Sequence, residues 1–178
     1  VTVTFSNTLS GSSTTQTVLK GEQVLLPNST ATGYKFNGWY TDKTYTTKVG
    51  NGNEKYTVLK DQTLYTYFEY EITYDLAGGN VENPTGYTED TESITLNNPT
   101  KFGYTFTGWT GTDLTEPTKT VTIPKGSKGA RSYTANWEVN EATVTYNYNG
   151  ATGNNSETQK NVAYDSEYGT CLLYTSDA

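Results

Sequence analysis

The sequence predicts a mainly β protein, built from small antiparallel-rich modules with little helix. Apolar residues alternate with polar ones, most often threonines, in many short segments, which is typical of strands with one buried face. Threonine makes up about a fifth of the 178 residues, and this β-branched residue suits the solvated face of a sheet. One segment also occurs twice at a spacing of 70 residues, which indicates tandem modules.

The alternating segments predict the strands in chain order. In the first, Val1, Val3 and Phe5 alternate with threonines. The same alternation predicts strands at 72–74, 94–96, 104–106, 121–123 and 133–137. Clusters of Gly, Pro and Asn predict turns between them, at 51–53, 77–80, 98–99 and 124–126. Helical signals are weak, and the best window, 84–93, allows a turn or two at most.

Self-similarity predicts the domain organisation. The segment 33–39, Gly-Tyr-Lys-Phe-Asn-Gly-Trp, recurs at 103–109 as Gly-Tyr-Thr-Phe-Thr-Gly-Trp. Flanking segments recur at nearly the same spacing: 3–5 at 72–74 and 144–146, and 66–69 at 135–138. We therefore predict repeat modules at 1–69 and 70–138, followed by the truncated start of a third at 139–178.

Composition excludes several classes of function. The chain has no histidine, the commonest general base and the commonest metal ligand. Cys171 is the only cysteine, so neither an internal disulfide nor a cysteine zinc cluster can form. The net charge of −7 and a single arginine, Arg131, argue against nucleic acid as a partner. No segment approaches the roughly 18 apolar residues of a membrane-spanning helix, so we expect no membrane insertion.

The repeated aromatic residues are predicted to build the core of each module. The modules are small, and a buried aromatic ring removes roughly 150–250 Å² from water, so most rings are needed inside. Strict alternation would turn Trp39 and Trp109 outward, where indoles can stack on sugar rings. The preceding glycines, Gly38 and Gly108, instead predict β-bulges that return both indoles to the core. The predicted core set is Tyr34, Phe36, Gly38, Trp39, Tyr104, Phe106, Gly108, Trp109 and Trp137.

Acidic residues are the next candidates for a site. Glu89, Asp90 and Glu92 are close in sequence, and Asp113 and Glu116 follow a glycine. Paired carboxylates could serve a glycosidase, and loop oxygens could bind calcium. However, no calcium-loop pattern is present, and the first repeat has no acids at the matching positions. We therefore predict solvated loops, with no catalytic residue, no metal site and no cofactor.

Lysines and asparagines give two weaker signals. A buried lysine can condense with Asn or Asp beside a catalytic Glu, but nothing singles out a partner for Lys20, Lys60 or Lys125. Glycosylation sequons at 28–30 and 154–156 are expected by chance in a chain so rich in Asn, Ser and Thr. Neither signal predicts a functional site.

The order of these motifs resembles the Listeria–Bacteroides repeat, also called the InlB B-repeat-like module. Units of that family open on a Val/Ile-Thr-Phe/Tyr strand, followed by a Gly-Gly turn, as at 78–79. Asn-Pro-Thr then leads into the Gly-Tyr-x-Phe-x-Gly-Trp motif, as at 98–109, and the unit closes on an aromatic such as Trp137 or Phe68. The resemblance implies small β-grasp-like modules with at most one short helix, and it brings no catalytic residues.

Two parts of the chain depart from the family pattern. The first repeat has Thr-Leu-Ser-Gly at 8–11 in place of the Gly-Gly turn, so we expect altered loops on the same fold. The third repeat stops before its aromatic motif, and we expect 139–178 to be partly ordered at best. Residues 171–178 resemble translated sequencing-adapter sequence and are expected to be non-native. Because it contains no methionine, the chain is expected to be part of a longer protein.

The resemblance also implies a function and a location. Such repeats occur in tandem in secreted and surface-anchored bacterial proteins, so we expect an extracellular protein of the cell surface or cell wall. We expect a non-enzymatic stalk or spacer associated with adhesion, in which modules joined by short linkers such as 138–141 hold a distal head away from the cell. The alternative is a module that binds a glycan or a host protein through exposed aromatics or strand edges.

Overall fold

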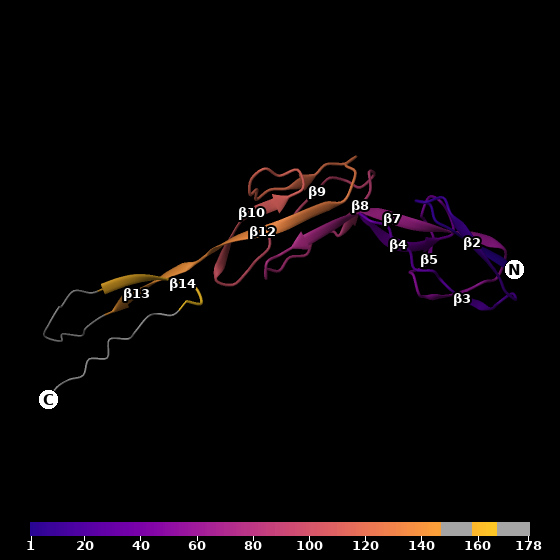
Figure 1. Ribbon diagram of the computed structural model, residues 1–178, viewed down its shortest axis with the longest axis horizontal. Helices are drawn as coiled ribbons and strands as arrows, with labels where there is room; N and C mark the ends of the chain where they lie inside the picture. The colour runs from indigo at the N-terminus through magenta and orange to yellow at the C-terminus, as the bar shows by residue number, and fades with distance from the viewer. Residues whose placement is uncertain (147–157, 167–178) are drawn as a thin grey trace, which may run out of the picture. The chain divides into compact units, whose positions relative to one another are not determined.

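The computed structural model describes residues 1–146 and 158–166 (Figure 1). Within them the chain forms strands β1 to β14 and no helix, which confirms the predicted mainly β fold. These residues accordingly contain no helix with the length and apolarity needed to cross a membrane. The segment 171–178, expected to be non-native, lies outside the described residues.

The window 84–93 is not helical, contrary to the weak signal in the sequence. It contains β8 (Gly86–Tyr87), which is followed by turns. β8 pairs with the middle of β7 (Gln62–Asp75), where Tyr87 lies opposite Tyr70. Tyr87 is buried, and its hydroxyl donates to Gly129 O and accepts from Arg131 Nε. Pairing and burial of this tyrosine outweigh a weak local preference for helix.

The chain separates into two compact units, and each is described by itself. The first comprises residues 1–73, 83–95 and 122–133. Besides β8 and most of β7, it holds β1 (Thr2–Ser6), β2 (Ser13–Thr17), β3 (Gln23–Leu25), β4 (Tyr34–Tyr40), β5 (Lys48–Gly50), β6 (Lys55–Thr57), β9 (Ile94–Thr95), β11 (Thr122–Ile123) and the start of β12 (Arg131–Val139).

Strands β1, β4 and β7 organise the first unit. β1 pairs antiparallel with β2 and parallel with β7, with Phe5 opposite Leu64. β4 pairs antiparallel with both β7 and β5. β3 with β6 and β9 with β11 form short antiparallel pairs. Val3 and Phe5 of β1 are buried between more exposed threonine and serine residues, as the alternation of the sequence predicts.

A bulge at Gly38 turns Trp39 into the core of the first unit. Phe36 lies opposite Phe68 of β7, but Trp39 lies opposite Thr66, so β4 contains one extra residue between them. Gly38 has a φ of +104°, and a Cβ on it would lie 2.6 Å from a main-chain oxygen of β5. The predicted bulge is therefore present. The buried core of this unit includes Val3, Phe5, Val24, Leu26, Trp39, Val58 and Leu64.

The second unit comprises residues 74–82, 96–121 and the described residues from 134 onward. β10 (Tyr104–Gly111) is hydrogen-bonded to β12, and β13 (Glu141–Tyr146) pairs antiparallel with β14 (Thr158–Ala163). Trp109 of β10 is fully buried. Gly108 before it has a φ of +149°, and a Cβ there would lie 2.6 Å from Thr118 N. Both tryptophans thus follow a glycine that cannot accept a side chain unless the backbone moves.

The repeats are joined with almost no linker. β7 runs unbroken from Gln62 to Asp75, across the predicted boundary after residue 69. β12 and β13 are separated by Asn140 alone, so the linker expected at 138–141 is a single residue. Equivalent main-chain hydrogen bonds are present at the two junctions between repeats. Glu71 N donates to Gly33 O (3.1 Å) at the first, and Asn140 N donates to Gly103 O (2.9 Å) at the second. The closing strand of each repeat therefore leads directly into the opening strand of the next.

Candidate binding site

The repeated aromatic residues contact one another inside each unit. In the first unit Trp39 packs edge-on against Phe5, with ring centroids 5.2 Å apart, and against Phe36 at 6.0 Å. Phe36 also contacts Phe68 at 5.5 Å. The same three contacts recur in the second unit, as Tyr74 with Trp109 (5.8 Å), Phe106 with Trp109 (5.4 Å) and Phe106 with Trp137 (5.6 Å). What repeats in the sequence is therefore a chain of mutually packed rings.

The predicted core set is divided between buried and half-buried positions. Trp39 and Trp109 are 3% and 0% exposed, and the glycines before them are buried. The remaining rings are half-buried: Tyr34, Phe36, Tyr104, Phe106 and Trp137. Trp39 Nε1 donates to Pro27 O at 2.7 Å, and Trp137 Nε1 donates to Leu76 O at 3.1 Å. The faces of Trp39 and Trp109 are covered, so neither offers a platform to a sugar ring.

The charged residues considered from the sequence lie at the surface. Glu92 pairs with Lys125 at 2.6 Å, and Glu89 pairs with Lys128 at 3.0 Å. Such exposed pairs contribute about 0–1 kcal/mol each. The other acids and lysines in question are exposed as well: Asp90, Asp113, Glu116, Lys20 and Lys60. In the described part of the chain, no three His, Cys, Asp or Glu side chains come close enough together to hold a metal ion.

A hollow of about 760 Å³ in the first unit, the tyrosine hollow, is rich in aromatic and hydroxyl groups. Its aromatic residues are Tyr34, Tyr45, Tyr67, Phe68, Tyr70 and Tyr87. Its polar residues are Thr8, Thr44, Thr88, Glu89 and Asp90, and its described lining contains no lysine or arginine. The volume falls within the range of about 300–1,000 Å³ that is usual for small-ligand sites.

The rings of the tyrosine hollow form two groups. The ring of Tyr45 is tilted against that of Tyr67, with centroids 4.5 Å apart and planes 35° apart. Tyr40 packs edge-on against both of them, at 5.6 and 5.5 Å. In the second group, Tyr70 contacts Tyr34 at 5.3 Å and Tyr87 at 5.4 Å. The rings that remain partly open to solvent are Tyr34, Tyr45, Tyr67, Phe68 and Tyr70.

Asp42 fixes the loop that carries Tyr45. Its carboxylate accepts hydrogen bonds from the main-chain N–H groups of Thr44, Thr46 and Thr47, at 3.0–3.1 Å, and from the Thr44 hydroxyl at 2.6 Å. These bonds, that of the Thr44 hydroxyl first, hold the pKa of Asp42 well below its usual range. Tyr45 itself has a φ of +56°, which is uncommon for a residue with a Cβ. The loop thus holds this ring against Tyr67 in an unfavourable backbone conformation.

The hydroxyls of Tyr67 and Tyr70 stay protonated at neutral pH. Burial raises the pKa of Tyr67 above its ordinary value, and the nearby Glu69 carboxylate raises it further. Desolvation likewise raises the pKa of Tyr70, with Glu89 adding to the effect. A protonated tyrosine both donates and accepts hydrogen bonds, whereas carboxylates only accept them. The tyrosine hollow therefore combines ring faces with hydroxyl donors and carboxylate acceptors.

The sequence prediction missed the tyrosine hollow because its characteristic rings do not repeat. Tyr67 corresponds to Asn136, and Tyr40 corresponds to Thr110. Asn136 Nδ2 donates to Thr110 Oγ1 at 3.0 Å, so a polar contact occupies that place in the second repeat. The loop after Thr110 has no aromatic residue to match Tyr45. A search for aromatics that occur in only one of the two repeats would have found these positions.

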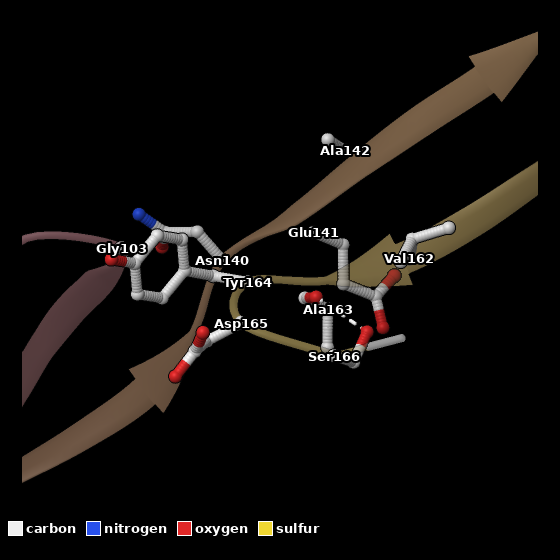
Figure 2. Close-up of a pocket in the computed structure, with 9 residues that line it drawn as sticks. All are labelled: Gly103, Asn140, Glu141, Ala142, Val162, Ala163, Tyr164, Asp165 and Ser166. Carbon is white, nitrogen blue, oxygen red and sulfur yellow. Dashed lines mark hydrogen bonds between the residues drawn. The ribbon is translucent and has the colours of Figure 1, made fainter. Parts of the chain in front are cut away.

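A second hollow, of about 560 Å³, lies in the second unit beside β13 and β14 (Figure 2). The ring of Tyr164 contacts Gly103 there and lies 5.3 Å from Phe102. The carboxylates of Glu141 and Asp165 point away from each other in Figure 2. The rest of its lining is Asn140, Ala142, Val162, Ala163 and Ser166. Among the described residues that line this hollow, no set of polar groups converges on it, which makes it the weaker candidate.

Comparison with known proteins identifies relatives of the chain. The family described as the Listeria-Bacteroides repeat domain matches residues 2–66 and again 70–130. Internalin H of Listeria monocytogenes serovar 1/2a is 38% identical over 103 residues, which are 56% of this chain and 18% of that protein. A "Putative Gly-rich membrane protein" of Evansella cellulosilytica is 29% identical over 147 residues, 76% of this chain and 16% of that protein. The chain spans less than a fifth of the length of these relatives. No solved structure matches it.

Proposed function

Because the chain belongs to the Listeria-Bacteroides repeat family, we propose that it is a non-enzymatic repeat region of a bacterial cell-surface protein and acts as a stalk or spacer. The repeating units in this proposal are the modules 1–69 and 70–138. Their task is spatial, since folded modules in tandem hold another part of the protein, associated with adhesion, away from the cell.

The recurring chain of packed rings is the observation that carries this proposal. Three ring contacts of the first repeat recur at matching positions of the second, and both tryptophans at the centre of the motif are buried. A tryptophan that is buried at the same place in both repeats serves packing, because its surface is not available to a ligand. The repeats also follow each other with almost no linker, as expected if their number sets a distance.

The relatives support the proposed location. One of them is named as an internalin, and another carries the name of a membrane protein. The acidic net charge of −7 suits an extended surface module, because like charges limit association between copies.

A surface-display experiment tests the stalk function. An epitope is displayed on bacterial cells beyond zero, one or two copies of the chain, and its accessibility to antibody-coated beads is measured. Accessibility should rise with each copy, and it should rise more than with flexible Gly-Ser linkers of equal residue number, which coil back on themselves. Equal accessibility with folded and flexible spacers would show that the modules do not act as a stalk.

A further inference from the structure

We propose that the tyrosine hollow is a binding site for a neutral oligosaccharide, held by the rings of Tyr45, Tyr67 and Tyr70. This function is additional to the stalk role and does not depend on it. It also differs from the expectation that exposed tryptophans would stack on sugars, because both tryptophans of the repeated motif are buried.

The first argument is that the fold does not require these rings. The second repeat packs the same chain of core rings but has Asn136 in place of Tyr67 and Thr110 in place of Tyr40. In the second repeat, the hydrogen bond between Asn136 and Thr110 takes the place of the contact between these two rings. Tyr67 stays partly exposed in the first repeat where the second repeat uses a polar residue, and such an exposed ring points to contact with another molecule.

The second argument is the way in which Tyr45 is held. Its φ of +56° disfavours any residue with a Cβ, and tyrosine is not among the residue types that tolerate it well. Four hydrogen bonds to Asp42 keep the loop in this form. Strain of this kind is typical of ligand-contacting loops, where it places a side chain before the ligand arrives. The ring it places lies 4.5 Å from that of Tyr67.

The third argument is the match between the groups of the hollow and a sugar. The C–H faces of a sugar ring carry partial positive charge, and they pack against the negative face of an aromatic ring. Tyrosine gives such contacts at low entropic cost, because its side chain has few rotatable bonds. The protonated hydroxyl of Tyr67 can donate to a sugar oxygen. The Tyr70 hydroxyl donates to Glu89 Oε1 at 3.5 Å, and its oxygen can accept from a sugar hydroxyl, as can Glu89 and Asp90.

Charge selects a neutral ligand. The described lining has two carboxylates and no lysine or arginine, so sialylated or sulfated glycans would be repelled. A basic peptide is the main competitor for such a surface. Glu89, however, already pairs with Lys128 at 3.0 Å, which lowers the attraction for a further cation. A polyol that needs ring faces and hydrogen bonds, and no net charge, fits the hollow best.

The test is binding of the whole chain to an array of neutral and anionic glycans, with a lysine- and arginine-rich peptide as the competing probe. Glycans that bind are measured again by titration calorimetry with two variants. Tyr67→Asn introduces the residue of the second repeat, and Tyr45→Asn removes the ring but keeps a residue that tolerates positive φ. Tyr164→Asn, which removes a 42% exposed tyrosine in the second hollow, is the matched control.

We expect at least one neutral oligosaccharide to bind, with an affinity about tenfold lower in each of the two variants and unchanged in the control. Absence of neutral glycan binding at millimolar concentration would overturn the proposal. So would binding of anionic glycans or of the basic peptide alone, or equal losses in all three variants. If Tyr67→Asn unfolds the chain by circular dichroism, Tyr45→Asn decides the result, because its ring lies on a loop outside the packed strands.

Discussion

Replacing Trp109 by alanine gives the most direct test of the predicted role of the repeated rings. The indole is fully buried and contacts Tyr74 and Phe106. A buried aromatic removes roughly 150–250 Å² from water, which at about 25 cal/mol/Å² corresponds to about 4–6 kcal/mol before relaxation. The alanine methyl and partial collapse of the cavity recover some of this, so we expect a loss of about 3–5 kcal/mol in the free energy of unfolding.

Urea denaturation followed by circular dichroism measures this loss, with Trp137→Phe as the matched control. Phenylalanine is the first repeat's residue at that position, Phe68, and Trp137 is only half-buried. The control mainly loses the hydrogen bond from Nε1 to Leu76 O, so it should cost about 1 kcal/mol. A Trp109→Ala protein within 1 kcal/mol of the unmodified chain, or no more affected than the control, would refute the core role of the ring.

Three further predictions concern the backbone, acid stability and surface charge. Gly38→Ala should lower the free energy of unfolding, measured by urea denaturation, more than Gly126→Ala does. Both glycines have positive φ, which penalises a Cβ by about 1–2 kcal/mol, but of the two only Gly38 would bring its Cβ against main-chain atoms. Equal losses in the two variants would contradict this close approach. Asp42→Asn should weaken the acid dependence of the free energy of unfolding. The folded pKa of Asp42 lies below its ordinary 3.8, so its contribution to stability is complete above about pH 4 and is lost as the pH falls. Acid unfolding that is unchanged in the variant would disprove the role of the Asp42 hydrogen bonds. Lys125→Ala should change the free energy of unfolding by less than about 1 kcal/mol at low or high salt, because its ion pair with Glu92 is exposed. A larger loss of stability would mean that the pair is shielded from solvent.

Features that depend on local spacing were predictable from the sequence. The alternation at Val3 and Phe5 specifies which side chains of a strand are buried, because neighbouring side chains point to opposite faces. A glycine directly before Trp39 indicated a bulge, since the backbone there needs a positive φ and close approach to another strand. Both features are encoded within a few residues, so the sequence is sufficient to identify them.

Features that depend on pairing between distant segments were not predictable. Nothing within 84–93 distinguishes a short helix from β8, because the deciding contact is with Tyr70 on β7. Three of the four residues at 138–141 are polar, which predicts a linker, but main-chain hydrogen bonding in β12 and β13 does not require apolar side chains. The same limit applies to the tyrosine hollow, whose rings come from loops and strands that are separated in the sequence.

The differences between the repeats separate the residues needed for folding from those available for binding. Residues that a module needs in order to fold must be present in every repeat, and the packed rings around Trp39 and Trp109 meet this condition. Tyr45 and Tyr67 do not meet it, and the first of them is held in an unfavourable conformation. A spacer made of identical modules would have no use for such residues. These differences support the proposal that the first repeat binds a ligand as well as acting as a spacer, and the second repeat shows the same ring packing without Tyr45 and Tyr67.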